Sequence, residues 1–144
     1  MTSAQRNTWH ALQYARAMCD AMTVLADGRE SALMLLPSID EFALAELDKL
    51  PRASPADIRA FKRRVSKEVD VARSHGPLSA ASYIAAVMYI VDDVRSSTRK
   101  REVADMLSNL LWLMQGVADA VDATDDQLAL DDADLLARAV RLAA

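Results

Sequence analysis

The chain has 144 residues and a net charge of −4, and 52% of its residues are hydrophobic. This length suffices for one domain with a buried core, and the hydrophobic share argues against intrinsic disorder. The single cysteine, Cys19, excludes an internal disulfide and fits a reducing compartment. Only three Gly and four Pro are present, which predicts a few long helices joined by short connections.

The first predicted helix covers residues 3–26. Apolar side chains recur along it at helical spacing, while Arg16 and Asp20 lie off this stripe. Asp27 and Gly28 follow, and Gly is the usual residue just past the end of a helix. The pattern therefore predicts a long amphipathic helix that ends in an acidic turn.

The second substantial helix is expected to begin after Pro37, which interrupts the apolar segment 30–50. Ser38, with Glu41 three residues later, has the pattern of a capping box. We therefore expect a helix from Ser38 to about residue 50, preceded by a short helical piece at 31–36.

The clearest helix start in the chain is formed by Ser54, Pro55 and Asp57. Ser is a preferred capping residue, Pro suits the first helical position, and an acid near this end interacts favourably with the helix dipole. The helix that follows has one apolar stripe and ends near Gly76. Its remaining surface carries the basic residues Arg59, Lys62, Arg63, Arg64 and Lys67.

The segment 78–94 is apolar almost all round. An all-round apolar helix outside a membrane belongs at the centre of a bundle, so we expect this helix to be the central one. The next helix, at 102–121, has a broad apolar face with Trp112 at its edge.

A last helix is expected from Asp132 to about residue 142, with Asp131 and Asp134 at its start. The predicted fold is therefore all-α, a compact single-domain bundle of six or seven helices that covers residues 1–144.

Charge is distributed unevenly along the chain. Residues 52–101 sum to +6, and residues 102–144 sum to −7. Seven carboxylates lie within sixteen residues at a junction between predicted helices, and they repel one another unless a cation or a basic partner neutralises them. They are Asp119, Asp122, Asp125, Asp126, Asp131, Asp132 and Asp134. Two interpretations stay open: the basic middle neutralises this end within the molecule, or the acidic surface binds a charged partner.

This acidic surface is a candidate cation site, because calcium and magnesium prefer carboxylate and carbonyl oxygens. Asp122, Thr124 and Asp126 have the spacing of the first calcium-loop ligands, but Gln127 stands where that loop needs Gly. An EF-hand is therefore excluded, which leaves an irregular site or a solvated acidic surface. The candidate ligands are Asp27, Asp119, Asp122 and Asp126. The remaining candidates, for contact with a basic partner protein, are Asp125, Asp131, Asp132 and Asp134.

No catalytic motif supports an enzyme. The chain has no nucleophile elbow, phosphate loop or dinucleotide fingerprint, and His10 and His75 have no partner at ligand spacing. The adjacent Asp92 and Asp93 leave a metal-dependent enzyme as a third hypothesis.

Several partner classes are disfavoured by charge and hydropathy. The sequence pI of about 5.1 and the lack of an aromatic stacking pattern argue against nucleic acid. The longest apolar run, residues 83–91, is too short to span a bilayer. We therefore expect a cytoplasmic protein without a transmembrane segment, and a homo-oligomer stays open.

The order of these features resembles the TerB-like tellurite-resistance family. In that family the first helix ends in an Ala-Asp-Gly turn, matched here by residues 26–28, and a later helix ends in a second Asp-Gly turn with an acidic run. Asp122, Asp131 and Asp132 match the second turn in part, while Ala123 stands in place of its Gly.

The resemblance implies a non-enzymatic cytoplasmic domain with a cation-binding acidic surface, which acts in stress and defence complexes at the membrane. The alternative is a protein–protein interaction module, such as an immunity, anti-defence or secretion-adaptor protein.

Overall fold

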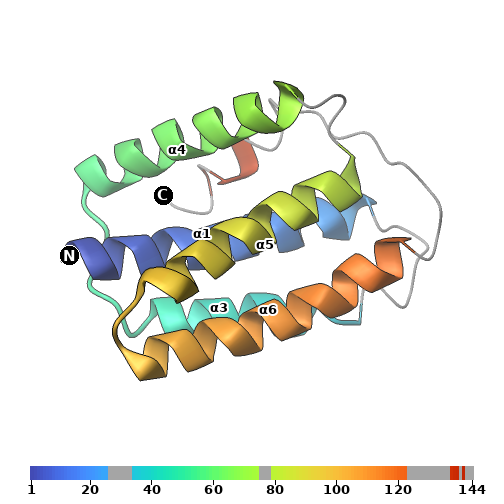
Figure 1. The fold of residues 1–144 in the computed structure, drawn as a ribbon. Helices are drawn as coiled ribbons and strands as arrows, with labels where there is room; N and C mark the ends of the chain where they lie inside the picture. The colour runs from blue at the N-terminus through green and yellow to red at the C-terminus, as the bar shows by residue number, and fades with distance from the viewer. Residues whose placement is uncertain (26–33, 75–78, 123–136, 140, 142–144) are drawn as a thin grey trace.

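The protein is an all-α bundle. The computed structural model describes residues 1–25, 34–74, 79–122, 137–139 and 141, and these residues form no strand. Residues 137–139 and 141 are helical and lie within the predicted last helix. The longer helices are α1 (Ser3–Leu25), α3 (Leu36–Leu47), α4 (Pro55–Ser74), α5 (Ala80–Ser97) and α6 (Arg101–Asp122) (Figure 1).

Four of these helices form a closed ring of contacts. α1 packs on α3 and α5, and α6 packs on the same two helices. α4 lies outside this ring, on the side of α1 and α5 away from α6 (Figure 1). The bundle therefore consists of a four-helix unit with a fifth helix on one face.

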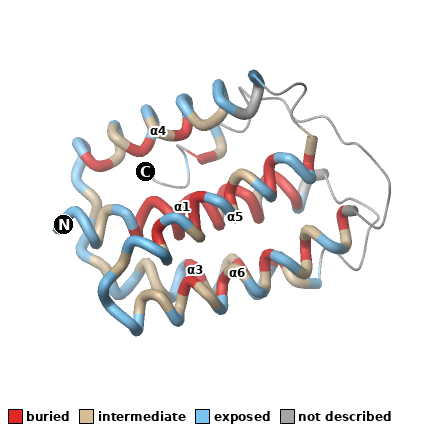
Figure 2. Tube along the Cα trace, in the orientation of Figure 1, coloured by how far each residue is buried: buried red, intermediate tan, exposed pale blue. Residues whose placement is uncertain are grey.

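The central helix is α1, because nearly every residue from Thr8 to Met22 is buried (Figure 2). Its alanines allow neighbouring helices to approach from several sides: Ala11, Ala15, Ala17 and Ala21. The prediction that the segment 78–94 is central holds in part, because α5 packs on α1, α4 and α6 but is not buried on all sides. In α5, Tyr89 is 73% exposed, so apolar residues lie both on the buried side and on the solvent-exposed side of this helix.

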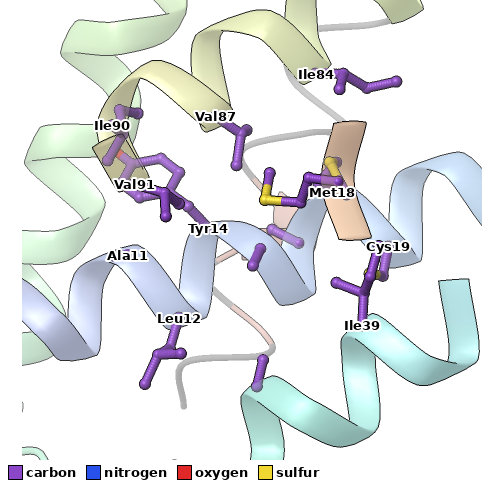
Figure 3. Close-up of a cluster of buried hydrophobic side chains, with 14 of the residues drawn as sticks. Ala11, Leu12, Tyr14, Met18, Cys19, Ile39, Ile84, Val87, Ile90 and Val91 are labelled. Carbon is purple, nitrogen blue, oxygen red and sulfur yellow. The ribbon is translucent and has the colours of Figure 1, made fainter. Parts of the chain in front are cut away.

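Large side chains from three helices fill the centre of the ring (Figure 3). Leu12 and Met18 of α1 are fully buried, together with Ile39 of α3 and Ile84 and Val91 of α5. Burying a side chain of this size contributes about 1.5–3 kcal/mol, so this cluster is a main source of stability for the ring.

Two ion pairs explain the charged residues that lie off the α1 stripe. Arg16 Nε lies 3.4 Å from a carboxylate oxygen of Asp40 in α3, and Arg138 donates to Asp20 over 2.8 Å. Both pairs lie where α1 meets a neighbouring segment, so these charges remain at the edge of the core.

The start of α4 confirms the prediction from Ser54, Pro55 and Asp57. The Ser54 amide and hydroxyl donate to the Asp57 carboxylate over 2.9 and 2.8 Å, and the Asp57 amide donates back to Ser54 Oγ over 3.2 Å. Arg6 also donates to this carboxylate over 2.8 Å. The capping box therefore anchors α4 to the beginning of α1.

The predicted start of the second helix is wrong. α3 begins at Leu36 with no side-chain cap, and the Ile39 amide donates to the Leu35 carbonyl over 3.1 Å. Pro37 lies in the first turn, where its missing N–H needs no partner. The helix therefore begins before Ser38. Residues 31–33 of the short piece predicted at 31–36 lie outside the described residues, while Met34 and Leu35 form a turn and Leu36 begins α3.

Within the part of the chain that the structure describes, no helix combines the length and apolar content needed to cross a membrane.

Candidate functional site

An open groove of about 750 Å³ lies between α5 and α6 on the surface of the bundle. These two helices are antiparallel and are joined by the short connection 98–100. The groove is lined from α5 by Ala81, Ala85, Met88, Tyr89, Asp92 and Arg95, and from α6 by Ser108, Leu111, Trp112, Gln115 and Ala118.

Two aromatic side chains in the groove are largely exposed to solvent. Tyr89 of α5 is 73% exposed, and Trp112 of α6 is 77% exposed. They point outward because the neighbouring residues Ile90, Val91 and Leu110 are buried on the core side of the same helices. Exposed Trp and Tyr side chains that share a groove are the residue types that dominate binding energy at protein interfaces.

The α5 wall is shallow at one end because it carries small residues. Ala81 and Ala85 lie one helical turn apart and are both exposed. Ala118 lines the groove from α6. Small side chains allow the backbone of a bound segment to approach this part of the groove closely.

The charged groups of the groove differ between its two ends. Arg95 Nε donates to Asp92 over 3.0 Å, so these opposite charges neutralise each other. Near the other end, Gln115 donates to the exposed Asp119 over 2.9 Å. Asp119 is therefore the described carboxylate at the end of the groove formed by the C-terminal part of α6, and no Lys or Arg occurs in the sequence between Arg101 and Arg138.

Comparison of the chain with protein-family models, with curated proteins and with solved structures gives no match. The resemblance to the TerB-like family therefore stays a prediction.

Most of the carboxylates predicted as site residues lie outside the described part of the chain. Asp119 is the one whose side chain the structure describes. Asp122 ends α6, but its side chain lies outside the described residues. The same holds for all atoms of Asp27, Asp125, Asp126, Asp131, Asp132 and Asp134. Among the described residues, no group of three His, Cys, Asp or Glu side chains could hold a metal. The calcium or magnesium site therefore stays a prediction.

The adjacent Asp92 and Asp93 have different surroundings. Asp92 is paired with Arg95 in the groove, and the Asp93 carbonyl accepts a hydrogen bond from Ser97 over 2.8 Å. Residues adjacent on a helix point about 100° apart, so these two carboxylates do not face the same point in space. The absence of enzymatic activity stays a prediction.

A cluster of buried polar groups lies on the face of α1 that meets α4, and the sequence analysis missed it. His10 Nε2, Gln13 Oε1 and the Tyr14 hydroxyl are all buried, and none has a hydrogen-bond partner among the residues that the structure describes. His10 Nδ1 lies 3.3 Å from the Arg64 guanidinium, and the His10 and Tyr14 rings both contact Phe61. The signal in the sequence is the i, i+3, i+4 spacing of polar residues within an otherwise apolar stretch.

Burial shifts the ionisation of these groups and of the nearby thiol. It lowers the pKa of His10 to about 4, with a further contribution from the Arg64 charge. Burial also raises the pKa of Tyr14 well above its usual range, and that of Cys19 to about 12. His10 is therefore neutral at physiological pH, and Cys19 remains a thiol.

Proposed function

We propose that this chain is a non-enzymatic interaction module, and that the groove between α5 and α6 receives an amphipathic helix of a partner protein. The observation that carries the proposal is the exposure of Tyr89 and Trp112 over one groove of about 750 Å³. A folded chain gains little from exposing two large aromatic side chains together, whereas a partner that buries them gains binding free energy.

The geometry favours a helix over an extended peptide. An extended peptide is held mainly by hydrogen bonds to an open sheet edge, and the described residues form no strand. A helix lying between α5 and α6 can place apolar residues at positions i, i+3 or i+4, and i+7 into the groove. The small residues Ala81 and Ala85 leave room for its backbone.

Charge favours a partner with basic residues beside its apolar stripe. Asp119 is exposed near one end of the groove, and the sequence continues into the Asp-rich run without a basic residue. Complementary charge of this kind accelerates association and orients the bound helix. The partner is therefore expected to bind more slowly at high salt.

The TerB-like function belongs to the same proposal. In that version the acidic end also binds calcium or magnesium, and the domain acts in stress or tellurite resistance. An immunity, anti-defence or secretion-adaptor role uses the same groove without a metal. A complex that persists after a chelator is added favours the immunity, anti-defence or secretion-adaptor role, which needs no metal.

The test compares two matched double variants in a pull-down from the source cells. Tyr89→Ala with Trp112→Ala removes the groove aromatics, and Leu44→Ala with Val71→Ala removes exposed apolar side chains elsewhere. Any protein retained by the wild type is then purified and titrated calorimetrically. We expect the groove variant to weaken binding at least a hundredfold and the control to match the wild type. Equal binding by both variants would refute the groove as the site.

A further inference from the structure

α4 presents four basic side chains to solvent on one face. Arg59, Lys62, Arg63 and Lys67 are all exposed, and their spacing of three, four and eight residues places them on one side of the helix. The opposite side holds the buried Phe61. Packing of that side against the bundle therefore fixes the outward direction of the four basic residues, which we call the α4 basic stripe.

The α4 basic stripe is not neutralised within the described structure. None of its four members forms an ion pair among the described residues, whereas Arg6, Arg16, Arg95 and Arg138 each pair with a carboxylate. Arg63 has a like charge four residues away in both directions, which is unfavourable in a helix. The interpretation that the acidic end neutralises the basic middle within one molecule involves the segment 119–134, most of which lies outside the described residues, so it stays a prediction.

We infer that the α4 basic stripe binds the Asp-rich segment 119–134 of a second copy of this chain. The stripe extends over about 12 Å along the helix at 1.5 Å per residue, and the segment offers seven carboxylates with no basic residue among them. A two-fold pair uses this contact twice, because each copy supplies one stripe and one segment.

The overall charge favours this occupant over a long polyanion. The protein carries a net charge of −4, while duplex DNA carries one negative charge about every 1.7 Å along its axis. Surfaces outside the stripe are repelled by such a polymer. A short acidic segment can bind the stripe without this repulsion from the rest of the protein surface. The α4 basic stripe lies on a different face from the α5–α6 groove, whereas the acidic segment begins at Asp119 beside the groove; the inference does not depend on the proposed function.

The test is sedimentation of the full chain at low and high salt. We expect a dimer at about 20 mM salt whose dissociation constant rises at least tenfold at about 500 mM, because salt screens exposed charges. This measurement needs no variant. A wild type that stays monomeric at low salt and high protein concentration would overturn the inference.

Two charge reversals locate the contact. Arg59→Glu, Arg63→Glu and Lys67→Glu should abolish the dimer. The matched control Arg99→Glu, Lys100→Glu and Arg101→Glu makes the same change in net charge on exposed residues at the end of the α5–α6 connection and the start of α6, and should leave the dimer intact. Dissociation of both variants alike would show general repulsion and overturn the inference.

A charge swap separates contact between copies from contact within one copy. Asp122→Lys, Asp125→Lys and Asp126→Lys should also give a monomer, and an equimolar mixture with the α4 reversal variant should form a heterodimer. A mixture that stays monomeric, or a monomeric wild type that binds anionic vesicles or duplex DNA through α4, would overturn the proposed occupant.

Discussion

Replacing Phe61 tests how α4 is attached to the rest of the bundle. The Phe61 side chain is fully buried, and its ring centroid lies 5.4 Å from Trp9, 5.5 Å from His10 and 5.2 Å from Tyr14. Truncation of a buried Phe to Ala costs about 3–5 kcal/mol in the free energy of unfolding. For a chain of this size, about 2–4 °C per kcal/mol gives a fall in Tm of about 6–20 °C.

Two controls separate the contributions in this experiment. Phe61→Leu keeps most of the buried volume but loses the two T-shaped ring contacts with Trp9 and Tyr14, worth about 0.5–1.5 kcal/mol each, so we expect an intermediate loss of about 1–3 kcal/mol. Val71→Ala, at a half-exposed position of the same helix, should change stability by less than about 0.5 kcal/mol. Urea unfolding followed by circular dichroism measures all three. A loss below about 1.5 kcal/mol for Phe61→Ala would refute the view that this ring cluster holds α4.

Four further predictions follow from the described contacts. The Ser54 and Arg6 hydrogen bonds lower the pKa of Asp57 below its unfolded value. The stability that these bonds contribute is therefore present above pH about 4 and is lost as the pH falls further. Asp57→Asn should make the midpoint of urea unfolding depend less on pH in this acidic range. Folding lowers the pKa of His10 from 6.5 to about 4. Between pH 6.5 and pH 4, His10 is therefore protonated in the unfolded state but neutral in the folded state. Stability should therefore fall on the order of 3 kcal/mol from pH 6.5 to 4, and a similar fall in His10→Gln would contradict this assignment. Tyr89→Ala with Trp112→Ala should alter unfolding free energy by less than about 1 kcal/mol, since both side chains are exposed, and a larger loss would mean that they support the fold. If the acidic end binds a cation, titration with millimolar calcium, magnesium or manganese should shift the amide NMR signals from Asp119 onward. Unchanged spectra and no heat in calorimetry would refute cation binding.

Local signals in the sequence predicted the local structure well. Ser54, Pro55 and Asp57 lie within four residues of one another, and their hydrogen bonds depend on little else in the fold, so this helix start could be read directly. The cap expected at Ser38 failed because Pro37 fits either before a helix or in its first turn. The sequence pattern alone does not distinguish these two positions.

Burial was harder to predict because it depends on which helices surround each element. The segment 78–94 has the more apolar sequence, but the alanine-rich α1 lies at the centre, since small side chains allow several helices to approach. The groove was missed for the same reason: the apolar character of α5 did not show that Ala85 and Tyr89 face solvent. The acidic site residues beyond Asp122 lie outside the described residues, so their prediction is neither confirmed nor refuted.

The alanines of α1 determine where this protein tolerates change. Ala11 and Ala15 are fully buried, so a larger side chain at either position would overpack the core, which typically costs about 1–3 kcal/mol. The outer faces of α4, α5 and α6 have no such restriction. The fold therefore tolerates larger side chains on those three helices, whereas substitutions at the α5–α6 groove or in the α4 basic stripe change surfaces that we propose to bind a partner.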